Sequence, residues 1–389
     1  MSRRVFGISL MVSQLFVLLV AAPGWAAVTC PLRLGFVRPE SGSGASFGHS
    51  LEEGLNMALK EINAAGGIAG CQVQLVAYDS QSIPSNAAVL ARRLIFQDRV
   101  PLIIGSSPSP EVVAMMEITE NAGVPLYVPS ASSVKITSQG YKFVWRQSVI
   151  DVSVAKLLVD TIVNDLHWKK VGFIYENTDY AKPVVTNVLS KALEAKGVQV
   201  VGSEAFNPGD TDLSGQLLRI KEAGADGLFY WGHEKEGAIL TTENQALKVA
   251  LPIVANTGVV YPGYLNLLSQ PVQDATKLIA AIPFVWTGGN DRQRAWVARF
   301  KAIYGIEPDV TSMDGYDAGY FLKAAITAAG STAPEALQKG ISATHYDGVG
   351  GEIFYDKTGQ AARALNVVQL TAKSGPGYRI LRTVPAGQY

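Results

Sequence analysis

The sequence contains few of the residues that build metal and redox sites. Among its 389 residues there are two cysteines and four histidines, and their spacing matches no zinc-binding motif. Basic and acidic residues number 33 each, with no basic patch or polybasic run. These absences argue against nucleic-acid binding and against attachment to anionic lipid. We expect no metal ion and no cofactor.

Long apolar runs are absent after residue 26. Residues 1–26 carry Arg3 and Arg4, then an apolar stretch over residues 8–22, and small residues at Gly24 and Ala26. This order predicts a secretory signal peptide cleaved after Ala26. The apolar stretch is too short and too often interrupted to favour a membrane anchor. The remaining chain, with 31 basic and 33 acidic residues and a net charge of −2, is expected to be exported and soluble.

The two cysteines, Cys30 and Cys71, each precede a predicted strand. If those strands are parallel neighbours, their starting ends lie together, and an exported compartment permits a disulfide between them. Two buried free thiols are the alternative. Lipid modification of Cys30 is disfavoured, because Thr29 stands where a small residue would be expected.

Strands and helices alternate along the chain, which predicts an α/β fold with parallel sheets covered by helices on both faces. A helix ending at Gly66 and Gly67 is followed directly by a strand, since glycine readily adopts the left-handed conformation of a helix C-terminus. The predicted strands are 32–37, 73–78, 102–104, 126–128, 170–175, 199–205, 227–231, 251–255, 277–281, 352–355 and 364–371, and the predicted helices include 84–98, 110–121, 152–166, 183–196, 213–223, 291–304 and 316–329. The number of strands exceeds one sheet, and a break falls near residues 146–151, so we expect two lobes.

Serines gather at the carboxyl ends of two predicted strands, where open parallel sheets bind ligands. Ser109 is predicted to cap a helix that begins at Pro110, so that the helix N-terminus could hold a carboxylate. Ser130 and Ser132, with Ala131 between them, follow the next strand and could donate to the same anion. The alternative is that each serine only caps its own helix.

Aromatic side chains and one histidine also follow predicted strand ends. His233 is the histidine that we place in a cleft, and Phe47 and Tyr180 lie in polar loops, which favours a role as cleft walls. Other aromatic residues near strand or helix ends are more often part of a core: Trp231, Tyr261, Tyr264 and Tyr316.

Two enzymatic interpretations are weak. Residues 44–48 match G-x-S-x-G, so Ser46 with His233 or His345 could form a hydrolase triad, but residues 38–43 separate this serine from its strand. The same glycine-rich stretch is one residue too long for a dinucleotide fingerprint, and no P-loop lysine is present. We expect no catalytic residues.

Several segments together resemble the branched-chain amino-acid-binding periplasmic proteins, the solute receptors of ABC importers. The matching segments are 61–70, 103–109, 128–132, 140–146, 179–181, 209–213 and 314–318, in order along essentially the whole mature chain. The resemblance implies the type I periplasmic-binding fold, with two Rossmann-like lobes, three hinge crossovers and a ligand trapped by hinge closure. The lobes would comprise residues 27–148 plus 283–356 and residues 149–282 plus 357–389. The implied location is the periplasm and the implied partner is an inner-membrane permease, with the receptor itself a monomer.

The resemblance also implies residue roles. Ser109, Ser130 and Ser132 match positions that bind the ligand's carboxylate and amino group, and Phe47, Tyr180 and Tyr316 match aromatic cleft walls.

The chain departs from this pattern at two positions. Thr257 stands where amino-acid-binding members usually carry an acid that pairs with the ligand's ammonium, and His233 stands where a tyrosine is common. The Cys30–Cys71 pair also differs from the family's usual pair. The ligand could therefore be a carboxylate with an apolar or aromatic body, although Glu40 or Glu234 could supply the missing acid. A sensory receptor that feeds a signalling partner is the alternative function.

Overall fold

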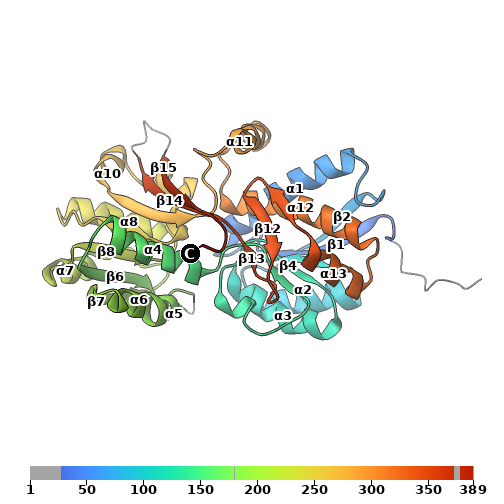
Figure 1. Cartoon of the computed structure of the whole chain (residues 1–389), viewed down its shortest axis with the longest axis horizontal. Coiled ribbons are helices and arrows are strands. Elements are labelled where there is room, and N and C mark those ends of the chain that lie inside the picture. The colour runs from blue at the N-terminus through green and yellow to red at the C-terminus, as the bar shows by residue number, and fades with distance from the viewer. Residues whose placement is uncertain (1–27, 179, 372–376, 389) are drawn as a thin grey trace, which may run out of the picture.

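The structure is a computed structural model that describes residues 28–178, 180–371 and 377–388. The predicted signal peptide lies outside these residues. Two α/β lobes lie side by side and are joined by three chain crossovers (Figure 1). The predicted fold class is confirmed. None of the helices in the described ranges is both long and apolar enough to cross a membrane.

The first lobe is built on a five-stranded sheet in the order β2-β1-β3-β4-β5, with all neighbours parallel. Its strands are β1 (Leu32–Arg38), β2 (Val73–Asp79), β3 (Ile103–Gly105), β4 (Leu126–Val128) and β5 (Val144–Arg146). Its helices are α1 (Ala45–Ala64), α2 (Pro84–Phe96), α3 (Ser109–Ala122), α12 (Val310–Ala329) and α13 (Pro334–Ala343). Leu32 pairs with Val73, so the starting ends of β1 and β2 meet. A disulfide joins Cys30 to Cys71 there, as predicted.

The second lobe is built on a seven-stranded sheet in the order β15-β14-β10-β9-β8-β6-β7. Its strands are β6 (Lys170–Glu176), β7 (Gln199–Phe206), β8 (Gly227–Trp231), β9 (Ile253–Ala255), β10 (Leu278–Ile282), β14 (Leu365–Leu370) and β15 (Tyr378–Val384). Its helices are α4 (Asp151–Asp160), α5 (Lys182–Val184), α6 (Ser190–Ala195), α7 (Ser214–Glu222), α8 (Glu234–Ala246), α9 (Pro262–Leu267) and α10 (Gln270–Ala275). The strands β14 and β15 run antiparallel at one edge.

The three crossovers lie after β5, between β10 and α11 (Asp291–Tyr304), and before β14. A small sheet of β11 (Tyr346–Gly348), β12 (Gly351–Tyr355) and β13 (Ala361–Ala362) precedes the third crossover. The fully buried Arg146 joins the first and third crossovers, because its Nε donates to Gln360 Oε1 at 2.6 Å and its backbone N–H donates to the Gly359 carbonyl at 2.8 Å. The residue numbers that we gave for the lobe boundaries stay a prediction.

Helix α12 begins six residues earlier than predicted. Asp309 forms a capping box with Ser312, in which each side chain accepts from the other residue's backbone N–H. The sequence carries this D-x-x-S signal, and apolar periodicity alone did not reveal it. Tyr316 therefore lies inside the helix and not at its start.

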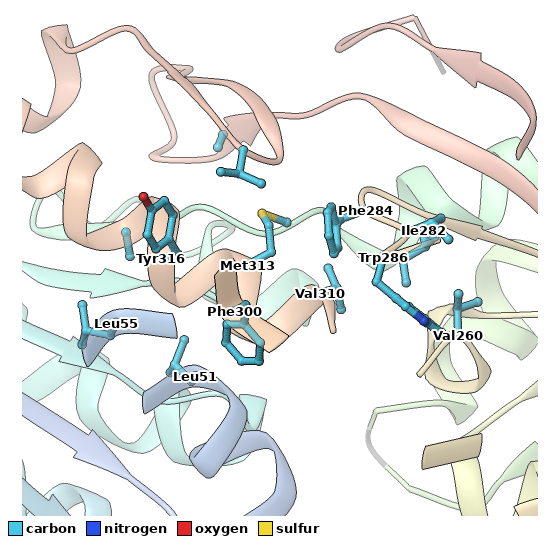
Figure 2. Packing of buried hydrophobic residues seen from close by; sticks show 14 of the residues in the cluster. Leu51, Leu55, Val260, Ile282, Phe284, Trp286, Phe300, Val310, Met313 and Tyr316 are labelled. Atoms are coloured by element: carbon cyan, nitrogen blue, oxygen red, sulfur yellow. The ribbon is translucent and has the colours of Figure 1, made fainter. Parts of the chain in front are cut away.

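Helices α1 and α12 pack closely in the core of the first lobe. Figure 2 shows Leu51 and Leu55 of α1 beside the helix that carries Met313 and Tyr316. The approach depends on glycine, since a Cβ added at Gly54 would lie 1.8 Å from the Ser312 carbonyl oxygen. This packing fixes the start of α1 against the start of α12, and both starts face the second lobe.

Candidate functional site

Ser109 lies at the carboxyl end of β3, in the first turn of α3. Its Oγ accepts a hydrogen bond from the Ser133 backbone N–H at 3.2 Å, which leaves its own hydroxyl proton available to an external acceptor. The prediction that Ser109 caps the helix is wrong. Pro108 is the N-cap, in an extended conformation (φ −69°, ψ 126°) that proline favours, and Ser109 is the first helical residue.

The serines after β4 lie beside two buried acids. The Ser130 hydroxyl lies beside the carboxyl group of Asp314 and 3.5 Å from Thr311 Oγ1. The Ser132 side chain lies beside the carboxyl group of Asp151. Between them, Ala131 is buried, and its carbonyl accepts from Ser148 Oγ at 2.8 Å.

The second lobe contributes a hydrogen-bonded group at the ends of β6, β8 and β9. His233 Nδ1 lies 2.6 Å from Glu176 Oε2, and Glu176 is buried. The ring of Tyr180 lies 5.3 Å from the His233 ring, and its hydroxyl accepts from Asn256 Nδ2 at 2.8 Å. Thr257 follows Asn256 and opens a short 3-10 helix. This lobe therefore presents an imidazole and a phenol that are each held by a buried polar partner.

Two titratable groups of this site have shifted pKa values. Burial lowers the pKa of His233, but the hydrogen bond and charge of Glu176 outweigh burial and raise it above its usual value. Burial raises the pKa of Asp151 to about 7, against the opposing effects of the Ser132 hydrogen bond and of Arg146 and His233. The site therefore stabilises the protonated form of His233 more than water does, and it contains a carboxyl group with a pKa of about 7.

Phe47 brings the two lobes together. It lies in the first turn of α1, and its ring contacts His233 at 5.9 Å and Tyr261 at 5.7 Å, both from the second lobe. The Tyr261 side chain lies beside Thr311 at the start of α12. The predicted residues Phe47, Tyr180 and His233 thus lie together. Ser132 lies near this group because it is beside Asp151, and Ser130 lies near it because it is beside Thr311.

Tyr316 does not join this group. Its hydroxyl donates to Glu61 Oε2 at 2.7 Å and accepts from Arg299 at 3.1 Å. Its ring packs at 5.6 Å from Trp296 in the core of the first lobe.

The hydrolase triad has no structural support. Ser46 lies inside α1, whereas β1 ends at Arg38, so this serine is not on a tight turn after a strand. His345 lies by Phe354 and Glu352 of the small sheet.

Four contributors to the site were not selected as site residues from the sequence: Asp151, Glu176, Asn256 and Thr311. Glu176 is the last residue of β6 and Asn256 directly follows β9, so the rule that ligands bind at strand carboxyl ends includes both, although that rule alone did not single them out. Asp151 begins α4 at the first crossover, and Thr311 is the second residue of α12.

Comparison with known proteins agrees with this architecture. A family model described as periplasmic binding protein matches residues 31–376. A leucine-, isoleucine-, valine-, threonine- and alanine-binding protein of Pseudomonas aeruginosa is 24% identical over 328 residues, which is 84% of this chain and 86% of that protein.

Two solved structures are similar. A leucine-binding protein from Thermotoga maritima has a TM-score of 0.82 and 26% identity, over 91% of this chain and 99% of its own. A solute-binding protein from R. palustris in complex with benzoate has a TM-score of 0.81 and 22% identity, over 92% and 98%, and this likeness is one of fold. By the family match over most of its length, the chain belongs to the periplasmic binding proteins.

Proposed function

We propose that this chain is the solute receptor of an ABC importer and binds a small carboxylate-bearing solute between its two lobes in the periplasm. The observation that carries this proposal is the cluster at the contact of the two lobes, in which Asp151 lies beside Ser132 of the first lobe and near His233 and Tyr180 of the second, while the Phe47 ring contacts His233. No catalytic step is needed for this role.

The donors suit an anion. Ser109 Oγ accepts from the Ser133 backbone N–H, and among the described residues its own hydroxyl proton has no acceptor. His233 is held by Glu176 through Nδ1, so a protonated ring directs its second N–H away from Glu176. The side chain is 43% exposed. A ligand carboxylate would receive charge-assisted hydrogen bonds from these groups.

The body of the ligand would pack against Phe47, Tyr180 and Tyr261, which gives a preference for apolar or aromatic groups. Ligands of both kinds occur among the similar proteins: leucine has an apolar body, and benzoate has an aromatic one. For an α-amino acid, Asp151 would supply the counter-charge that Thr257 lacks, because its carboxyl group lies beside Ser132.

Binding would couple to lobe closure. The contacts of Phe47 with His233 and Tyr261 join different lobes, so they are lost when the lobes separate. A ligand held by both lobes favours the closed state by its difference in affinity for the two states.

The test is a thermal-shift panel with leucine, valine, benzoate and a short acyl acid, each paired with its neutral amide. We expect at least one acid to raise the melting temperature with increasing concentration, and its amide to have little effect. Equal shifts from an acid and its amide would contradict carboxylate recognition. Loss of uptake of the identified acid in a strain lacking this chain supports import, whereas unchanged uptake points to the sensory alternative.

Replacing Ser109 with alanine is expected to weaken the binding of that acid about 5- to 100-fold, because one hydrogen bond to a charged group is lost. Isothermal titration measures the effect. The exposed Ser138 provides a matched control, since Ser138→Ala removes the same group from a residue whose hydroxyl oxygen bonds only Gln139 among the described residues. Unchanged affinity in Ser109→Ala would remove this hydroxyl from the site.

A further inference from the structure

Two serines of the candidate site lie beside carboxyl groups that are almost fully buried. Ser130 lies beside Asp314, which is 1% exposed, and Ser132 lies beside Asp151, which is 3% exposed. The Asp151 backbone N–H also donates to the Ser132 carbonyl at 3.3 Å. Each of these serines therefore has its own buried acid.

Asp314 is held by residues of two crossovers. From the first crossover, Gln147 Nε2 donates to the Asp314 carbonyl at 2.9 Å and to its Oδ1 at 3.3 Å. From the third crossover, Arg363 Nη2 lies 3.7 Å from the same Oδ1. Thr311, one turn earlier in α12, lies 3.5 Å from Ser130 Oγ. These contacts fix the carboxyl group of Asp314 beside Ser130.

Burial governs the charge of Asp314. Arg363 from the third crossover favours the ionised form, and Asp317 from the same helix opposes it. The phenol groups of Tyr355 and Tyr261 also interact with this acid. Burial is the largest of these effects and raises the pKa of Asp314 to about 7. The carboxyl group is therefore present in both forms near neutral pH.

Asp151 has the same property. It begins α4 at the first crossover. Arg146 of β5 and His233 of the second lobe favour its ionised form, and the phenol group of Tyr180 also interacts with it. Burial again outweighs these charges and raises the pKa of Asp151 to about 7. The two serines are thus matched by two acids that titrate in the same range.

The two forms of a carboxyl group use a neighbouring hydroxyl in different ways. An ionised carboxylate only accepts hydrogen bonds, so it uses the proton of the serine beside it. A protonated carboxyl group donates its own proton to the serine oxygen, which leaves the serine proton for another acceptor. A solute carboxylate is such an acceptor, and an ionised carboxylate nearby repels it whereas a neutral carboxyl group does not. Binding of an acid therefore favours the protonated form of both aspartates.

We propose that Asp314 and Asp151 are positioning residues that take up protons from solvent when the solute binds and so direct the hydroxyls of Ser130 and Ser132 to its carboxylate. The inference rests on the proposed function, because it needs an acid at these serines. Each aspartate donates its proton to the serine oxygen, and the serine hydroxyl donates to the solute. Affinity for the acid therefore falls as the pH rises through 7. The ammonium group of an α-amino acid would take the place of the proton at Asp151.

Isothermal titration of the unaltered mature chain with benzoate, or with the short acyl acid, measures this proton uptake. Titrations at pH 7 in HEPES and in Tris, whose enthalpies of protonation differ, give the number of protons bound with each acid. We expect about one proton, because each aspartate is about half ionised at pH 7. If only leucine or valine binds, we expect about half a proton, from Asp314 alone. Binding with no proton uptake, or with proton release, overturns the inference.

Asp314→Asn and Asp151→Asn locate the protons. An asparagine amide donates to the serine oxygen as a protonated acid does, but it does not titrate. Each variant is expected to lower the proton uptake with benzoate by about half, and to lower the ratio of the dissociation constants at pH 8 and pH 6 by at least about threefold. A residue that only supports the fold would weaken binding by the same factor at both pH values. Glu117→Gln, at an exposed acid of α3, is the control and should keep both values.

The proposed function and this inference can fail separately. If no acid of the thermal-shift panel binds, the proposed function fails and the inference fails with it. If an acid binds but takes up no proton, only the inference fails. Proton uptake that persists undiminished in both variants would belong to His233, and it also overturns the inference.

Discussion

Replacing Arg363 with leucine is expected to lower the free energy of unfolding by about 3–5 kcal/mol, the usual cost of leaving a buried charge without its partner. Arg363 lies in the third crossover, where its Nη2 is 3.7 Å from Asp314 Oδ1 and 4.0 Å from Asp317 Oδ2. All three residues are at most 1% exposed. Leucine would leave two carboxyl groups of α12 facing an apolar side chain.

The loss is expected to depend on pH. Burial raises the pKa of Asp314 to about 7, although Arg363 opposes this effect. The pKa of this carboxyl group is higher in the folded state than its usual value of about 4. Protonation of the group therefore adds to the free energy of unfolding; this contribution is complete at a pH below about 4 and is lost as the pH rises through 7. Without Arg363 the neutral form is favoured further. The loss in Arg363→Leu should therefore be at least about 1 kcal/mol smaller at pH 5 than at pH 8.

Urea unfolding at the two pH values measures both effects. Arg219→Leu is the matched control, because Arg219 pairs with Glu204 at 2.8 Å while its own side chain is 57% exposed. That substitution is expected to cost less than about 1 kcal/mol at either pH. If Arg363→Leu lowered the free energy of unfolding by no more than Arg219→Leu does, the buried group would contribute no more stability than a surface ion pair.

The Arg363 group illustrates what the sequence could not predict. Asp314 and Arg363 come from a helix and a crossover far apart in the chain, and no short pattern links an acid in α12 to a base before β14. The residues at strand ends were easier to predict, because alternation of strands and helices places the carboxyl ends of all parallel strands at one edge of the sheet. That rule placed Ser109, Ser130 and His233 at this edge, and the structure has them after β3, β4 and β8; their role in binding stays a prediction.

The aromatic residues also differ in how well the sequence predicted their positions. Phe47 and Tyr180 were predicted from polar loops. The loop prediction is wrong for Phe47, which lies in the first turn of α1 and contacts His233 of the second lobe, whereas Tyr180 contacts His233 within the second lobe. Tyr316 was matched by resemblance alone, and its place in the second turn of α12 directs it to Glu61 and the core. The lobe contact also depends on Tyr261 and Thr311, whose pairing follows from how the lobes meet and has no local signal in the sequence.

Replacing Gly54 with alanine is expected to destabilise the first lobe by about 3 kcal/mol, since overpacking against backbone cannot be relieved by a side-chain rotation. The added Cβ would lie 1.8 Å from the Ser312 carbonyl oxygen and 2.9 Å from the Tyr316 backbone nitrogen. The contact is as close from the side of α12, where a Cβ added at Gly315 would collide with the Leu51 carbonyl oxygen. Helices α1 and α12 would have to move apart.

That movement reaches the candidate site. Helix α1 carries Phe47 and α12 carries Thr311, so separation of the helices changes how the first lobe meets His233 and Tyr261. We therefore expect Gly54→Ala to weaken ligand binding as well as stability. Gly215→Ala is the control, because Gly215 lies exposed in α7 and its Cβ would meet only the flexible Arg219 side chain at 3.4 Å. There alanine should leave stability unchanged or raise it slightly, since glycine is the poorer helix former. Equal melting temperatures for the two variants would show that the contact between α1 and α12 can relax, and would remove the reason for glycine at this crossing.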